Sequence, residues 1–200
     1  MRSITETCVP RADVRAGGLT DNHFAAQLDQ VVRNPRGHEV YGSPDQFFAL
    51  TYPTQGLKTM LARSFGRLTG AKVEGAQHGV MRSETSFGGG KTHSLIAVYH
   101  LAKGARPASL SELIDPALLP RACSVAAIVA DTLDPVNGLE TNGFVTHTLW
   151  GELGAQLGPS AYEELRRSDE TRAGPVALSS LPLLLHRIAV NSSLQSKILS

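Results

Sequence analysis

The stretch TSFGGGKT at positions 85–92 constrains the fold of this chain more than any other part of its sequence. The glycines Gly88–Gly90 allow backbone conformations that a Cβ would obstruct, so neighbouring N–H groups can converge on one point. Apolar residues recur at helical spacing after Lys91 and Thr92, and we expect a helix from Lys91 that ends at Gly104. A glycine loop that opens directly into a helix is typical of an anion-binding turn.

Short strands are predicted on both sides of this loop and helix. Val80 and Met81 suggest a strand before the glycines, and Val125–Ala130 is a continuous apolar run with the length of a buried parallel strand. Strand, glycine loop, helix and strand in this order indicate the α/β class. We therefore predict a P-loop NTPase-like parallel sheet, incomplete within this chain, with an N-terminal helical extension.

The remaining periodic segments predict helices. Thr54 is expected to cap a helix that ends at Gly70. Leu149, Trp150 and Leu153 lie on one side of another predicted helix. The predicted helices cover residues 23–34, 54–69, 146–157 and 161–167. We divide the chain into a helical lead-in over 1–75, a partial P-loop core over 76–172 and a divergent tail over 173–200.

The residues of the glycine loop match the chemistry of phosphate binding. Backbone N–H groups and a helix N-terminus attract the phosphate oxygens, a lysine adds a positive charge, and the hydroxyl beside it can bind Mg²⁺. Thr85 stands where the usual GxxxxGK[ST] pattern has its first glycine. We predict ATP and Mg²⁺ as ligands, with Thr92 as a magnesium ligand through its hydroxyl. The predicted nucleotide-binding residues are Thr85, Ser86, Phe87, Gly88, Gly89, Gly90, Lys91, Thr92 and His93.

Hydrolysis needs a further acid at the tip of a neighbouring strand, and usually a glutamate that polarises water. Asp131, directly after the apolar run, is the candidate for the magnesium-shell acid and so the candidate catalytic residue. Thr132 follows it where an acid would be expected. All 18 acidic residues of the chain lie before Thr171, so the last segment offers none. The motif therefore supports nucleotide binding better than hydrolysis.

Composition narrows the classes of partner. The net charge is near +1, so no overall basic field indicates direct nucleic-acid binding. No apolar run reaches the roughly 18 residues that a membrane span requires, and the first residues lack the apolar core of a signal peptide. We expect a cytoplasmic protein without membrane association.

Three longer stretches resemble a known prokaryotic family: SETSFGGGKTHSLIAVYHLAKGA, the upstream FFALTYPTQGLKTMLARSFGRL, and DPVNGLETNG with TLWGELGAQLG. This family is catalogued as domain of unknown function 499 and is related to AAA+ ATPases. The resemblance covers roughly residues 1–172. It implies ATP binding by Gly88–Thr92, a magnesium-shell Asp-Glu pair further along the chain, and partners from DNA-modification or defence systems.

Three interpretations remain open at this point. The chain is an ATP-binding N-terminal fragment of an AAA+-like ATPase that lacks part of its hydrolytic residues, or a small competent NTPase that uses Asp131. In the third interpretation it is a non-enzymatic interaction fragment with a vestigial P-loop, in which the helices at 23–34 and 54–69 contact a partner.

Overall fold

Helices form most of the described chain. The computed structural model describes residues 8–9, 12–17, 26–37, 39–77, 79–84, 89–121 and 123–174, and the backbone of residues 187–191. The α-helices are α2 (Ala12–Arg15), α3 (Leu28–Arg33), α4 (Glu39–Gly42), α5 (Pro44–Ala49), α6 (Gln55–Thr69), α7 (Lys91–Ala102), α8 (Leu110–Leu113), α9 (Leu149–Leu157) and α10 (Pro159–Glu170). The 3₁₀ helices are η2 (Pro35–Gly37), η3 (Pro116–Leu118) and η4 (Ala130–Thr132).

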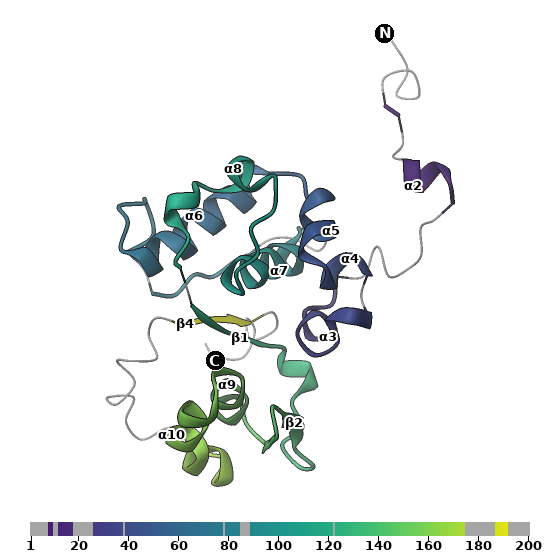
Figure 1. Ribbon diagram of the computed structural model, residues 1–200. Coiled ribbons are helices and arrows are strands. Elements are labelled where there is room, and N and C mark those ends of the chain that lie inside the picture. The colour runs from purple at the N-terminus through teal and green to yellow at the C-terminus, as the bar shows by residue number, and fades with distance from the viewer. Residues whose placement is uncertain are drawn as a thin grey trace.

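The described strands form two separate pairs. They are β1 (Ser124–Ile128), β2 (Leu139–Thr141), β3 (Phe144–Thr146) and β4 (Arg187–Asn191). β1 and β4 are parallel, with Ser124 opposite Arg187 and Ile128 opposite Asn191. The helices α5 to α8 lie on one side of this pair, and α9, α10 and β2 lie on the other (Figure 1). The chain is therefore a helix-rich mixed α/β fold.

The sequence predicted α6 with both of its ends. The Thr54 hydroxyl accepts a hydrogen bond from the Leu57 N–H at 3.3 Å, which satisfies one of the unpaired donors at the helix start. Gly70 ends the helix with a φ of 71°, in the left-handed region that a Cβ disfavours. Both predictions are confirmed because capping depends on neighbouring residues alone.

One hydrophobic core joins α3, α5, α6 and α7 to β1. Apolar residues on all sides of α7 match its central position, since a helix that is apolar all round is usually buried. A parallel strand is buried on both faces, which explains the continuous apolar run of β1. The most buried members of this core include Leu28, Val31, Phe47, Phe48, Leu61, Phe65, Ile96, Val98 and Leu101.

The prediction of a strand at Val80 and Met81 is wrong. Residues 79–84 form no strand, and Val80 and Met81 are exposed by 86% and 44%. Two apolar residues are fewer than most strands contain, and Gly79 before them has little strand propensity. The parallel pairing in the described residues joins β1 to β4, which lies within the segment predicted as a divergent tail.

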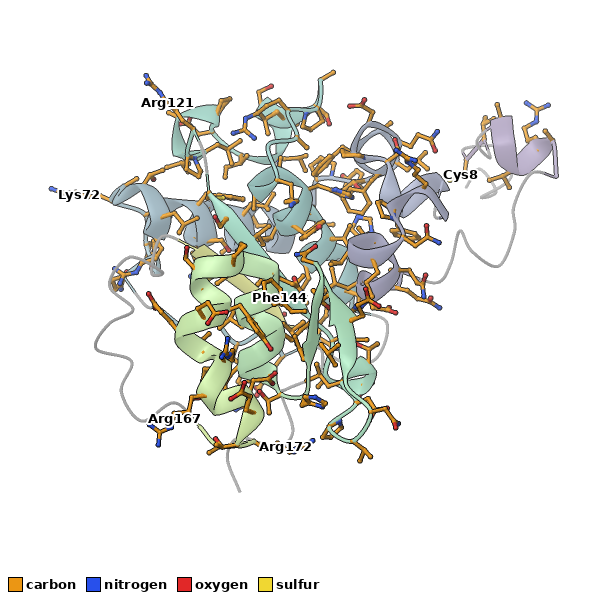
Figure 2. All side chains as sticks on the ribbon, turned by 60° about the horizontal axis from the view of Figure 1, so that its bottom comes forward. Cys8, Lys72, Arg121, Phe144, Arg167 and Arg172 are labelled. Carbon is orange, nitrogen blue, oxygen red and sulfur yellow. The ribbon has the colours of Figure 1, made fainter. Side chains whose placement is uncertain are left out.

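A β-hairpin and two helices form the other side of the molecule. Asn142 and Gly143 have φ angles of 51° and 83°, the left-handed pair that a tight hairpin turn between β2 and β3 requires. The helix predicted from residue 146 begins only at Leu149, since residues 144–146 form β3 and Thr148 caps the helix. Phe144 lies against Tyr162 of α10, with ring centroids 4.2 Å apart (Figure 2).

Candidate functional site

The glycine loop leads into α7 as the sequence predicted. Gly90 is the N-cap residue with a φ of 71°, and a Cβ built there would meet no atom within 4 Å. Glycine is therefore favoured by the backbone conformation, and no atom of the described residues would crowd a Cβ there. The first intrahelical bond runs from the Ser94 N–H to the Gly90 carbonyl at 2.9 Å, and the Ser94 hydroxyl donates to the same oxygen at 3.0 Å.

The electrostatics of this helix start favour an anion. No side chain caps the helix, and its first turn contains no acidic residue. The N–H groups before Ser94 precede the i→i−4 bonds and lie at the positive end of the helix dipole. Lys91 and Thr92 are half-buried in this turn, and Gly89 and Gly90 are exposed. The arrangement provides donors and positive charge at an accessible position.

The predicted phosphate loop is divided between described and undescribed residues. Gly89, Gly90, Lys91, Thr92 and His93 belong to the described chain. The other four residues of the prediction lie outside it: Thr85, Ser86, Phe87 and Gly88.

His93 lies in the first turn of α7 and packs against α5. Its ring centroid is 4.5 Å from that of Phe47, and its Nε2 is 3.0 Å from the Thr51 hydroxyl. That hydroxyl donates to the Phe47 carbonyl at 2.7 Å, so its single hydrogen is used and Nε2 of His93 must donate to it. Burial lowers the pKa of His93, which favours the neutral ring. The side chain thus fastens the start of α7 to the segment after α5.

His100 contacts the same aromatic cluster from further along α7. Its Nε2 donates to the Tyr41 carbonyl at 2.7 Å, and its ring centroid is 5.4 Å from that of Phe47. Burial lowers the pKa of His100, although the bond to Tyr41 opposes this shift. The two histidines therefore contact the same aromatic ring, Phe47, with His100 buried and His93 half-buried. Within the described residues, no group of three His, Cys, Asp or Glu side chains could hold a metal ion.

Asp131 is exposed in η4, three residues after β1 ends. The Cys123 thiol donates to the Ala102 carbonyl at 3.2 Å, so the end of α7 lies beside the start of β1. From this contact the chain runs forward through β1 to Asp131, and it runs backward through α7 to Lys91. Asp134, the next acid, accepts from the N–H groups of Val136 and Asn137 at 2.9 Å, as a turn former does.

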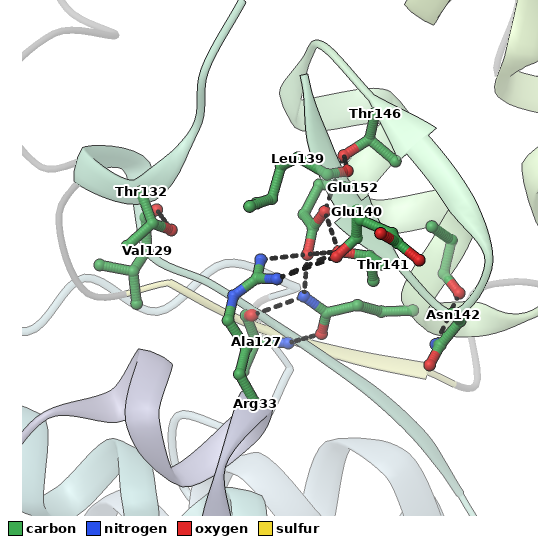
Figure 3. Close-up of polar contacts among 12 residues, drawn as sticks. Arg33, Ala127, Val129, Thr132, Leu139, Glu140, Thr141, Asn142, Thr146 and Glu152 are labelled. Atoms are coloured by element: carbon green, nitrogen blue, oxygen red, sulfur yellow. Dashed lines mark hydrogen bonds and ion pairs between the residues drawn. The ribbon is translucent and has the colours of Figure 1, made fainter. Parts of the chain in front are cut away.

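Two buried carboxylates were not singled out from the sequence. Glu152 and Asp169 are each 1% exposed, on α9 and α10. The Glu152 oxygens accept from Arg33 at 3.0 Å and Gln156 at 2.7 Å, and also from the hydroxyls of Thr141 and Thr146 (Figure 3). Arg33 lies 119 residues before Glu152, and the backbone donors to Asp169 lie more than 20 residues before it, so local spacing does not predict these buried acids.

Gln156 connects this carboxylate to the sheet. Its side-chain oxygen accepts from the Ala127 N–H at 2.8 Å, and its side-chain nitrogen donates to the Ala127 carbonyl at 2.9 Å. These two bonds occupy the backbone groups of β1 at Ala127. Unpaired strand edges favour unwanted strand pairing, so this contact protects the edge at that residue.

The surface cations marked in Figure 2 are spread over the molecule. In that view, Lys72 and Arg121 lie at the upper left, and Arg167 and Arg172 lie at the lower edge. In the described part of the chain, no helix has the length and apolar character needed to cross a membrane.

Comparison with known proteins identifies the family of this chain. The DUF499 N-terminal domain matches the chain over residues 9–189. This match extends past residue 172, where the resemblance was expected to end, and it includes the first residues of β4. No curated protein and no solved structure matches the chain.

Proposed function

The chain belongs to the DUF499 family, and we propose that it binds ATP together with Mg²⁺ at the start of α7. The observation that supports this proposal is the conformation of Gly90, which opens a helix without a side-chain cap at φ 71° and has no atom of the described residues within 4 Å of a Cβ built there. Phosphate oxygens can approach a backbone of this kind closely, since no Cβ stands between them and the N–H groups.

The side chains of the first turn complement this backbone. Lys91 supplies a positive charge for the terminal phosphates, and the Thr92 hydroxyl is a suitable ligand for a phosphate-bound Mg²⁺. Bound Mg²⁺ would offset the negative charge of the phosphates. The packing of His93 on Phe47 holds this turn against α5, so the donors are ordered before a ligand arrives.

Replacement of Lys91 by alanine is expected to weaken Mg²⁺-ATP binding by roughly tenfold to a hundredfold, because a charge-assisted hydrogen bond contributes about 1.5–3 kcal/mol. Isothermal titration of the full chain measures this change. Lys103→Ala is the matched control, since Lys103 is exposed at the opposite end of the same helix. Absent binding in the wild type, or equal affinity in Lys91→Ala, would refute the proposal and favour the interaction-fragment interpretation.

Hydrolysis is a separate question that depends on Asp131. Since Asp134 is engaged in a turn and Thr132 follows Asp131, the described residues near the end of β1 offer Asp131 as the carboxylate outside that turn. We propose nucleotide binding without efficient turnover. A competent NTPase that uses Asp131 is the alternative, supported by the position of this residue directly beyond a parallel strand.

The Asp131→Asn variant is expected to bind Mg²⁺-ATP with wild-type affinity, and neither protein is expected to release phosphate measurably. A phosphate-release assay with saturating ATP tests this expectation. Turnover by the wild type that disappears in Asp131→Asn while binding persists would establish the alternative. Asp115→Asn is the control, since Asp115 is an exposed acid that caps η3.

A further inference from the structure

A short segment between α5 and α6 lies beside the proposed phosphate site. It comprises Thr51–Thr54 and is held at both ends. The Thr51 N–H donates to the Phe48 carbonyl at 3.2 Å, and the Thr54 N–H donates to the Tyr52 carbonyl at 2.8 Å. Pro53 restricts the backbone further, because its ring fixes φ. The segment therefore has a defined conformation although it is neither helix nor strand.

The Thr51 side chain joins this segment to the first turn of α7. Its hydroxyl donates to Phe47 and accepts from Nε2 of His93 at 3.0 Å. His93 is the second residue after Lys91, so the hydrogen bond reaches the same turn that carries the proposed phosphate contacts. Tyr52 is the next residue after Thr51, and its position is thereby coupled to that turn.

Tyr52 differs from the other aromatic residues around it. Tyr41, Phe47 and Phe48 are buried in the core, whereas Tyr52 is 80% exposed. Among the described large hydrophobic residues that are exposed, Tyr52 is the one aromatic side chain. An aromatic ring on a well-held segment loses little conformational freedom when it binds a flat ligand.

We propose that Tyr52 is the residue on which the base of the bound nucleotide stacks. The inference rests on the proposed function, since the phosphates at the start of α7 would bring the rest of the nucleotide near the Tyr52 segment. Stacking on an aromatic ring accepts every base, because each has a π-face. Tyr52 therefore contributes affinity for a nucleoside triphosphate over a bare polyphosphate, with similar affinity for ATP and GTP.

Titrations with two probes separate base stacking from phosphate binding. The full chain and its variants are titrated with Mg²⁺-ATP and with Mg²⁺-tripolyphosphate. Tyr52→Ala is expected to weaken ATP binding roughly tenfold, the usual size of a base–aromatic stack, and to leave tripolyphosphate binding unchanged. Tyr52→Phe is expected to retain wild-type affinity for both. Val136→Ala is the control, as Val136 is similarly exposed, at 78%.

The possible results distinguish this inference from the proposed function. Unchanged ATP affinity in Tyr52→Ala, with affinity lost in Lys91→Ala, overturns the stacking role and leaves phosphate binding intact. Parallel loss of ATP and tripolyphosphate binding in Tyr52→Ala shows a structural effect and also overturns the stacking role. Unchanged affinity in Lys91→Ala rejects the proposed function itself.

Discussion

Replacement of Glu152 by alanine is expected to lower the free energy of unfolding by about 3–5 kcal/mol, because several donors around this buried carboxylate would each lose an acceptor, at about 1–3 kcal/mol for each unsatisfied group. The carboxylate joins four parts of the chain, because its partners lie on α3, β2, β3 and α9 (Figure 3). Without it, the hydroxyls of Thr141 and Thr146 and the amide of Gln156 lose an acceptor. Urea unfolding followed by circular dichroism measures the loss.

Two further variants test whether the network causes this effect. Glu152→Gln keeps the shape but presents an NH₂ group to a site filled with donors, so we expect an intermediate loss of about 1.5–3 kcal/mol. Glu163→Ala removes an acid from an exposed pair with Arg166, where the side chains are 60% and 51% exposed, and the unfolding midpoint should stay at its wild-type value. Equal stability of Glu152→Ala and wild type would contradict the importance of the buried network.

Replacement of Gly151 by alanine is expected to lower the free energy of unfolding by about 3 kcal/mol, the upper end for overpacking of a core. A Cβ at this position would overlap the Asp169 carboxyl. That carboxyl accepts from the N–H groups of His147 and Thr148, at 2.9 and 2.7 Å, and from the Thr148 hydroxyl at 2.7 Å. The substitution therefore displaces the group that binds the start of α9.

The matched control for Gly151→Ala is the same substitution at Gly56. Gly56 lies in α6, and a Cβ there would meet no atom within 4 Å. Alanine has the higher helix propensity, so Gly56→Ala should leave stability unchanged or raise it by up to about 1 kcal/mol. If both alanine variants were equally stable by urea unfolding, close packing of α9 on α10 at Gly151 would not be required.

The local elements were predicted with the most success. Thr54 and Gly70 bound α6, α7 begins at Lys91, and the apolar run at 125–130 overlaps β1 over Val125–Ile128, because capping, glycine conformation and apolar length are properties of adjacent residues. The prediction of a strand at Val80 and Met81 was wrong because strand formation depends on more than adjacent residues. A strand needs a partner, and two apolar residues do not show whether one is present.

The residues of α9 that are buried also differ from those that its apolar spacing predicted. The predicted side of Leu149, Trp150 and Leu153 is only half-buried, whereas Gly151 and Glu152 are buried. Close approach to α10 requires glycine, and the hydrogen-bonded network permits a carboxylate in the interior. Hydrophobic spacing cannot indicate either condition, because both depend on residues from other elements.

By itself, the sequence determined the local features of this protein: a glycine turn at the head of a helix, with Lys91 and Thr92 in its first turn, and the family to which the chain belongs. Tertiary structure decided which side chains meet. It joined His93 to Thr51, Glu152 to Arg33, and Gln156 to the backbone of β1. The physical reason is that backbone conformation depends on neighbouring residues, whereas contacts between distant residues arise only when their elements pack together.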